Sequence, residues 1–262
     1  MVYAVIMTTP QLPRPFLDIP IAHRGLHDAG AGRPENALSA VRAAAGAGYG
    51  VEIDLQLSAD GVPMVIHDPT LDRTTEGHGP VQALRAEDLA AVALRGGAGE
   101  GVATLQAALA EIAGRVPVLL EIKDTGGNLG PDVGVLEVAV ARAIAGYVGP
   151  LAVMSFNPHS MAAMARFAPG VPRGLITCAF VGVRFLRATP ERLSELASIP
   201  DYDRVSACFV THHRKDLDNP RLAALRAQGA AVLSWTIRSP VAEARARLVA
   251  DNITFEGYLP NL

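Results

Sequence analysis

The alternation of short, β-branched apolar runs with Ala- and Leu-rich segments of helical period constrains this chain most. Runs of the first kind have the length of buried strands, and the longer segments have the spacing of amphipathic helices. The predicted strands are 19–22, 50–57, 118–122, 151–155, 174–178, 205–210, 231–237 and 253–255. The predicted helices are 36–45, 105–113, 133–145, 158–167, 191–197, 221–227 and 241–249. Repeated β/α units of this kind predict an α/β fold, a (β/α)8 TIM-type barrel.

Two features depart from plain alternation, one after the second strand and one after the last. A further extended piece, 62–67, follows the second strand, and an excursion over 68–101 is too long for an ordinary βα loop. We interpret 68–101 as a small insertion at the mouth of the barrel. Only 257–262 follow the last strand, which leaves no room for an eighth helix, and we expect the proline-rich first 17 residues to cover one barrel end.

Length and charge limit the classes of function. The 262 residues, half of them hydrophobic, can bury one substantial core, so we expect a single barrel domain over 1–262. The formal net charge of −3 gives no general attraction to nucleic acid or to an anionic membrane. A small-molecule partner is therefore expected, while the oligomeric state is left open.

The two cysteines and the first residues bear on location. Cys178 and Cys208 lie inside apolar stretches, which predicts buried free thiols in a reducing compartment. The apolar run at 2–7 is short, lacks a basic segment before it and is followed by prolines, so neither a signal peptide nor a membrane span is expected. We expect a cytoplasmic protein without stable membrane insertion.

Acidic residues fall where predicted strands reach one end of the barrel. Glu52 and Asp54 lie two apart in one strand and so share a face, and Glu121 closes the third strand. Three converging carboxylates repel one another unless a cation lies among them. All-oxygen ligands select a hard divalent ion, Mg²⁺ or Ca²⁺. The alternative is a structural salt bridge or a strand face exposed to water.

His23 and His67 also close extended segments, and they are the candidate proton carriers. Imidazole titrates near neutral pH, so it can take and give a proton there. Phosphodiester cleavage needs both steps, because one group activates the nucleophile and another protonates the departing alkoxide. Each histidine by itself has a structural alternative, a satisfied residue at a strand end.

Arg24 and Lys123 are the cations next to these residues. A guanidinium offers a planar fork to phosphate oxygens, and an ammonium offers a movable point charge. An anionic substrate is therefore expected. Each cation also has the alternative, compatible role of neutralising a neighbouring carboxylate.

The ordered set of these residues resembles the glycerophosphodiester phosphodiesterase family. No single dipeptide is specific, but the five motifs in this order are, and with two later dipeptides the resemblance spans about 19–237. The motifs are His23-Arg24-Gly25, Pro34-Glu35-Asn36, Glu52-x-Asp54, His67-Asp68 and Glu121-x-Lys123, and the dipeptides are Ser155-Phe156 and Trp235-Thr236.

The resemblance implies a barrel with a small insertion after strand two and metal-dependent hydrolysis of glycerophosphodiesters to glycerol 3-phosphate and an alcohol. It implies that Glu52, Asp54 and Glu121 hold the divalent ion, that His23 and His67 act as general acid and base, and that Arg24 and Lys123 grip the phosphate. It also implies attack by the adjacent glycerol hydroxyl, giving a cyclic phosphate that water opens.

Three further residues of these motifs have a structural explanation as well as a role at the site. Asn36 is expected to cap the following helix and Glu35 to suit its dipole, with positioning of the site as the second reading. Trp235 would lie against the glycerol or alcohol moiety, although a core position explains it almost as well. The pair His212-His213 is expected in a loop after the sixth strand, solvated by default, with contact to the substrate as the alternative.

The end of the chain departs from the family, which commonly finishes its last strand with Thr-Asp, a proline and a helix. Here Thr254-Phe255-Glu256 stands at that place, so the resemblance leaves the far wall of the pocket and recognition of the alcohol undefined. Alternative functions are a lysophospholipase D-type phosphodiesterase, a catalytically silent phosphoester-binding barrel, and a metal-dependent hydrolase or lyase of another substrate class. An apolar groove would favour the first; Leu84, Leu89, Val92 and Leu94 are the only hint of one, and they are expected to pack onto the barrel.

Overall fold

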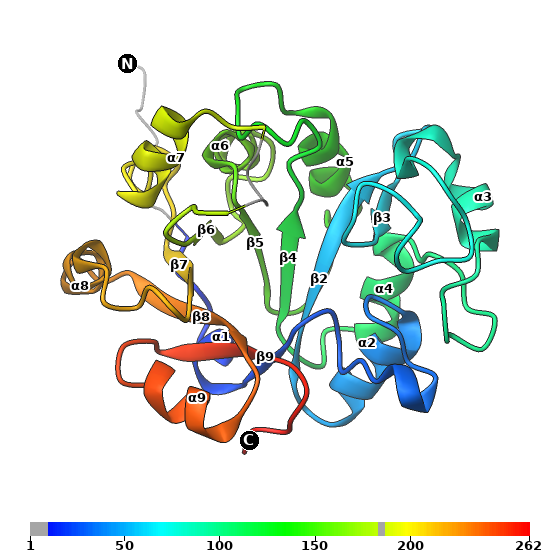
Figure 1. Ribbon diagram of the computed structural model, residues 1–262, viewed down its shortest axis with the longest axis horizontal. Helices are drawn as coiled ribbons and strands as arrows, with labels where there is room; N and C mark the ends of the chain where they lie inside the picture. Colours follow the sequence, from blue (N-terminus) through cyan, green and yellow to red (C-terminus); the bar gives the residue numbers. More distant parts are fainter. Residues whose placement is uncertain (1–9, 183–186) are drawn as a thin grey trace.

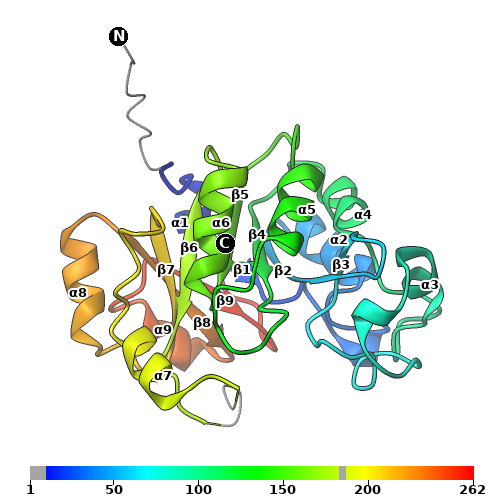
Figure 2. The same ribbon diagram turned by 90° about the horizontal axis from the view of Figure 1, so that it is seen from above.

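The computed structural model describes residues 10–182 and 187–262, and its central feature is a closed barrel of parallel strands (Figures 1 and 2). Pairing of the first barrel strand with both the second and the last closes the sheet. The barrel strands, in order, are β1 (Ile21–Ala22), β2 (Gly50–Leu57), β4 (Val118–Ile122), β5 (Leu151–Ser155), β6 (Arg173–Thr177), β7 (Phe209–His213), β8 (Ala231–Ile237) and β9 (Asn252–Phe255). One further strand, β3 (Pro63–Val65), pairs antiparallel with β2 outside the barrel. The predicted barrel is confirmed.

Helices surround these strands (Figure 1). Those after barrel strands are α2 (Leu38–Gly46), α4 (Leu105–Ile112), α5 (Val135–Ala143), α6 (Pro158–Phe167), α7 (Pro190–Ala197), α8 (Pro220–Ala227) and α9 (Pro240–Ala246). Each of the last four begins with proline behind a polar capping residue whose side chain accepts a backbone N–H from the first turn of the helix. The capping residues are Asn157, Thr189, Asn219 and Ser239. Proline has no N–H to satisfy at this position, so the local sequence sets where these helices begin. Within 10–182 and 187–262, no helix has both the length and the apolar character needed to cross a membrane.

Alternation along the strands separates the helix-facing side of the barrel from its interior. On β2, Ile53 and Leu55 pack with residues of the surrounding helices, whereas Glu52 and Asp54 belong to the opposite face. On β4, Leu119 lies among interior residues, and Glu121 shares its face. The interior of the barrel is therefore apolar toward the amino-terminal ends of the strands and acidic toward their carboxyl ends.

A short helix before the barrel, α1 (Pro15–Asp18), covers the amino-terminal end of the strands. Phe16 is fully buried and packs with interior residues, including Leu119 and Phe209. The amide of Asn252 donates to the carbonyl oxygens of Phe16 (2.8 Å) and Ile19 (2.7 Å), which ties this segment to β9. The predicted cover is thus present over 10–18, and residues 1–9 lie outside the described part of the chain.

The insertion packs onto the barrel. It contains the 3-10 helix η2 (Val81–Ala83) and α3 (Ala86–Ala91), and a second short 3-10 helix, η1 (Ala29–Ala31), lies earlier, between β1 and α2. Leu89 and Leu94 are buried in a cluster with residues such as Met64, and Leu84 and Val92 pack against that cluster. These leucines and valines therefore cover the barrel, as expected, and supply no apolar groove.

The sixth predicted strand was placed too early. Residues 205–206 end a turn and 207–208 have no regular structure, with Val205 and Ala207 buried; the strand itself is β7, Phe209–His213. Val205 N–H donates to the carbonyl oxygen of Asp201, so an apolar run that looks like a strand is here a buried turn. Both histidines of the 212–213 pair consequently belong to the strand and not to a loop. Cys178 and Cys208, by contrast, are buried free thiols as predicted.

Candidate active site

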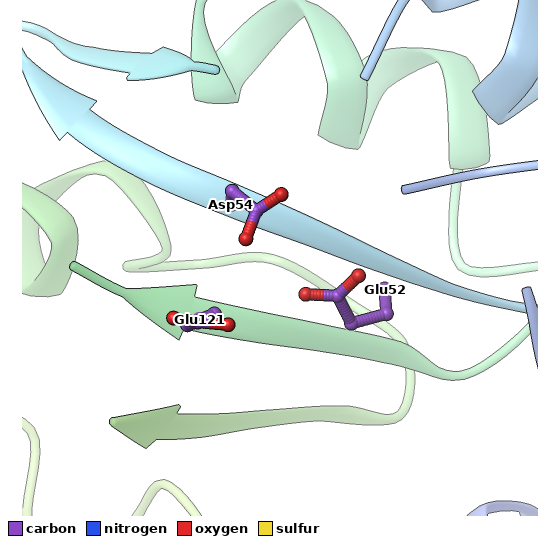
Figure 3. A group of neighbouring side chains, drawn as sticks. All are labelled: Glu52, Asp54 and Glu121. Atoms are coloured by element: carbon purple, nitrogen blue, oxygen red, sulfur yellow. The ribbon is translucent and has the colours of Figure 1, made fainter. Parts of the chain in front are cut away.

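Three carboxylates meet inside the barrel at the carboxyl ends of β2 and β4 (Figure 3). The parallel register sets Asp54 beside Glu121, and Glu52 lies two residues earlier on the same face as Asp54. One ligand oxygen from each carboxylate lies within 4.8 Å of the others, and all three residues are buried. The sequence-predicted acids are therefore brought together in one cluster.

The charges in this cluster are unequally compensated. The Lys123 ammonium lies 2.6 Å from Asp54 Oδ1 and 2.6 Å from Glu121 Oε1. Burial opposes the ionised form of Asp54, but the positive charges of Lys123, His67 and Arg24 outweigh it and hold the pKa of Asp54 well below its ordinary value. Burial and the neighbouring negative charges raise the pKa of Glu52 well above its ordinary value.

These oxygens fit a divalent cation. Glu52 Oε1 is buried and has no hydrogen-bond partner within residues 10–182 and 187–262. A buried carboxylate oxygen without a partner is costly, and a hard cation beside it would remove that cost. Together with Asp54 and Glu121 it offers an all-oxygen donor set, of the kind that Mg²⁺ and Ca²⁺ prefer.

His23 directly follows β1 and is held by an acid from the other end of the chain. Its Nδ1 lies 2.6 Å from Glu256 Oε2, and both side chains are largely buried. Glu256 Oε1 in turn accepts a hydrogen bond of 2.5 Å from Arg238 Nε. Burial lowers the pKa of His23, while the same hydrogen bond holds the pKa of the Glu256 carboxyl far below its ordinary value against the opposing effect of burial.

His67 follows β3 and has a corresponding arrangement. Its Nδ1 lies 2.5 Å from Asp68 Oδ1, and Asp68 Oδ2 accepts a hydrogen bond of 2.5 Å from Arg73 Nε. The side-chain amide of Gln56, on β2, donates to the His67 carbonyl oxygen (3.2 Å). His67 is therefore held both at its imidazole ring and at its backbone carbonyl group.

The turn after β1 folds closely against the start of α2. Arg24 and Gly25 both have positive φ, +59° and +75°. A Cβ at Gly25 would lie 2.8 Å from the carbonyl carbon of Ala40, so only glycine fits this approach. The Arg24 N–H donates to Glu52 Oε2 (2.9 Å), and its guanidinium donates to Glu35 Oε1 (2.6 Å).

The expected capping roles of Glu35 and Asn36 are wrong, and the alternative of positioning the site is what the geometry shows. Helix α2 begins at Leu38, behind Ala37, with no side-chain cap. The Asn36 amide instead donates to Asp54 Oδ2 (2.8 Å), and its oxygen accepts the Asp54 N–H (3.2 Å). Asn36 has φ +62°, a left-handed conformation that asparagine tolerates better than most residues, so it turns away from the helix and into the barrel.

Seven of the eight predicted site residues, Trp235 among them, surround two adjoining cavities. The first has a volume of about 140 Å³ and the second about 210 Å³. They share His67, Glu121, Lys123 and Phe156. His23, Arg24, Glu52 and Trp235 line the first cavity only. Asp54 lies beneath this group, fully buried.

Comparison with known proteins identifies the family to which the chain belongs. A model of the glycerophosphoryl diester phosphodiesterase family matches residues 23–253, most of the chain. The chain belongs to this family. A glycerophosphodiester phosphodiesterase from Caldanaerobacter subterraneus subsp. tengcongensis is 34% identical over 165 residues, 60% of this chain and 65% of that protein. The bovine glycerophosphodiester phosphodiesterase 1 is 52% identical over 71 residues, 26% of this chain, so the match spans a fifth of that relative.

Solved structures share the fold of this family member. A phosphodiesterase from Oleispira antarctica, in complex with the product sn-glycerol-3-phosphate, superposes with a TM-score of 0.73 at 24% identity, covering 92% of this chain and 94% of that one. A glycerophosphodiester phosphodiesterase from Parabacteroides distasonis gives 0.69 at 20% identity, covering 90% and 91%.

Several residues at the site of this family member escaped the sequence reasoning. Glu256 and Arg238, which follow the last two strands, are two of them. His213 was expected in a solvated loop, with substrate contact as the alternative, and it ends β7 beside Trp235, at 4.8 Å between ring centroids. The rule that selected His23, namely a polar residue just after a barrel strand, also applies to Glu256. His212, in contrast, is fully buried between Thr177 Oγ1 (2.7 Å) and Asp216 Oδ2 (3.0 Å), a structural position.

Proposed function

We propose that this member of the glycerophosphoryl diester phosphodiesterase family hydrolyses glycerophosphodiesters to glycerol 3-phosphate and an alcohol. The observation that carries the proposal is one cavity that joins a buried triple-carboxylate cluster, two carboxylate-held imidazoles and two cations. The product bound by the Oleispira antarctica relative supports the same substrate class. We further propose that 1–262 acts as a single barrel domain.

Proton transfer falls to the two histidines. His23 and His67 each have Nδ1 engaged by a carboxylate, which leaves Nε2 to face the cavity that both line. One imidazole withdraws the proton of the attacking hydroxyl, and the other protonates the departing alkoxide. An attacking hydroxyl already carried by the substrate would gain the advantage of proximity.

Arg24 and Lys123 bind the phosphate in this proposal. An ammonium has three N–H donors. Lys123 donates one to Glu121 and forms an ion pair with Asp54, so even with one N–H turned toward Asp54 another is left for a phosphate oxygen. Arg24 is oriented by Glu35 through one terminal nitrogen. The neutralising roles that the sequence left open are thus compatible with phosphate binding.

Glu52, Asp54 and Glu121 would hold one divalent cation, Mg²⁺ or Ca²⁺. When bound, the cation would supply positive charge beside the reacting phosphate. The Asn36 amide donates to the Asp54 carboxylate and accepts the Asp54 backbone N–H, so this ligand is oriented before any cation binds.

The two cavities give the two substituents on phosphorus separate places. In the first, Trp235 directs its indole N–H to the Thr211 carbonyl oxygen (3.0 Å) and lines the wall with its ring, which suits the carbon face of a glycerol unit. The second cavity includes Leu129, Pro69 and Phe156 and would receive the alcohol. Its partly apolar lining is the one observation that favours the lysophospholipid alternative.

The test is direct. Purified protein is incubated with glycerophosphocholine, glycerophosphoethanolamine and glycerophosphoglycerol, with and without EDTA, and glycerol 3-phosphate is measured. We expect EDTA-sensitive release from at least one, restored by Mg²⁺ or Ca²⁺. A lysophosphatidylcholine arm, read out as free choline, tests the alternative. Activity that persists without metal would contradict the mechanism, and metal binding without turnover of any diester would indicate the silent barrel.

A further inference from the structure

We infer that Glu256 is a positioning residue for His23: its carboxylate holds the imidazole in the tautomer that presents Nε2 to the substrate. The inference rests on the proposed function for its catalytic consequence. The residues that carried the family resemblance do not include Glu256, and the chain departs from the family pattern at this place.

Strand register brings the two residues together. Ala22 on β1 pairs with Phe255 on β9, so His23 and Glu256 are the next residues along two neighbouring parallel strands. The His23 N–H donates to the Phe255 carbonyl oxygen (2.9 Å), and the Glu256 N–H donates to the Ile237 carbonyl oxygen (3.0 Å). Both backbones are therefore fixed where the side chains meet.

The contacts of the Glu256 carboxylate leave one tautomer for a neutral His23. An ionised carboxylate only accepts hydrogen bonds, so the His23 Nδ1 that lies 2.6 Å from it must carry the proton. Nε2 is then the unprotonated nitrogen and can take a proton from a hydroxyl in the cavity. Arg238 donates to the other carboxylate oxygen, so Glu256 is itself held in place.

A matched pair of variants separates positioning from general stability. Glu256→Gln keeps the shape of the side chain but removes the charge. The control is Glu243→Gln on α9, where a carboxylate of similar exposure accepts hydrogen bonds from Tyr258 Oη (3.0 Å) and Arg247 Nε (2.8 Å) away from the cavity. We expect Glu256→Gln to lower kcat by about 10- to 100-fold with KM changed by about twofold at most, and Glu243→Gln to leave both unchanged.

Coupling to His23 is the sharper test. If Glu256 acts through the imidazole, the double variant His23→Ala/Glu256→Gln should be no slower than His23→Ala alone. An additive loss in the double variant, or a Glu256→Gln enzyme with the wild-type kcat, would overturn the inference while leaving the proposed function intact.

A measurement without substrate keeps the inference separate from the activity. Nitrogen-15 NMR of histidine-labelled protein, with the His23 signals identified by their loss in His23→Ala, reports which ring nitrogen carries the proton. We expect the Nδ1–H form in the wild type and a changed tautomer population in Glu256→Gln. An Nε2–H form in the wild type would overturn the inference even if the protein hydrolysed no diester at all.

Discussion

The two histidines of the pocket are held by the same chemistry built in two different ways. We call His23, Glu256 and Arg238 the His23 arm, and His67, Asp68 and Arg73 the His67 arm. In each arm, Nδ1 meets a carboxylate whose other oxygen accepts a hydrogen bond from an arginine at 2.5 Å. Each imidazole is thereby held through Nδ1, and both line the same cavity.

The arms differ in how far apart their members lie in the sequence. His67 and Asp68 are adjacent, whereas 233 residues separate His23 from Glu256. The first pair is formed within one turn, while the second forms only when β9 pairs with β1 and closes the barrel. A carboxylate can thus be brought to an imidazole by local sequence or by topology, and only the local arrangement is visible as a motif.

The largest expected effect tests whether the arms are catalytically equivalent. His23→Ala and His67→Ala should each lower kcat by about a hundredfold or more, because each removes one half of the proton transfer. Steady-state kinetics on an accepted glycerophosphodiester would measure this, with calorimetric Mg²⁺ or Ca²⁺ titration as the check on an intact acidic cluster. If one variant kept near wild-type kcat, the histidine it removes would not take part in proton transfer, and the two arms would not be equivalent.

Most of the fold was predictable from local pattern. The strands 50–57, 118–122, 151–155 and 231–237 were predicted at the bounds they have, because β-branched apolar runs with sharp polar ends define them. The misplaced sixth strand shows the limit. A buried turn and a buried strand have the same apolar composition, and only the backbone of Val205 and Ala207 separates them.

The site was predictable where residue type and strand end coincide. Glu52, Asp54 and Glu121 were placed by alternation and barrel geometry alone, and the structure brings them together. Asn36 was misread because its local sequence resembles a helix cap, while its left-handed backbone sends the amide to Asp54. Glu256 was missed as a partner because its contact depends on barrel closure.

A smaller effect separates the carboxylates of the two arms. Asp68→Asn should lower kcat by about tenfold, at the lower end of the loss expected for Glu256→Gln. The loss is smaller because the Gln56 side-chain amide still donates to the His67 carbonyl oxygen. It should also cost about 1 kcal/mol of stability at pH 7, a fall in Tm of about 2–4 °C.

The pH dependence of that stability difference has a definite sign. Burial opposes ionisation of Asp68, but hydrogen bonds from His67 and Arg73 outweigh it and hold the pKa of Asp68 well below its ordinary value. A carboxylate with a lowered folded pKa stabilises the protein above its unfolded pKa of about 3.9, and this contribution is lost as the pH falls through the folded value. Thermal melts of wild type and Asp68→Asn should therefore converge below about pH 4. Curves that diverge on acidification would contradict this account.

The smallest effect compares the two arginines. Arg73 makes paired hydrogen bonds to both Asp68 and Glu35, whereas the ion pair of Arg238 within residues 10–182 and 187–262 is with Glu256 only. The two arginine side chains are 49% and 57% exposed. Because exposed ion pairs are screened by solvent, Arg238→Gln should cost about 0.5 kcal/mol or less, and Arg73→Gln about 1 kcal/mol, since it also frees the acid that orients Arg24. Urea unfolding at low salt and at 0.5 M salt (about a threefold shorter screening length than at 0.05 M) would show both differences shrinking. An Arg238→Gln cost equal to that of Arg73→Gln would mean that the long-range arm depends on its arginine as much as the local one does.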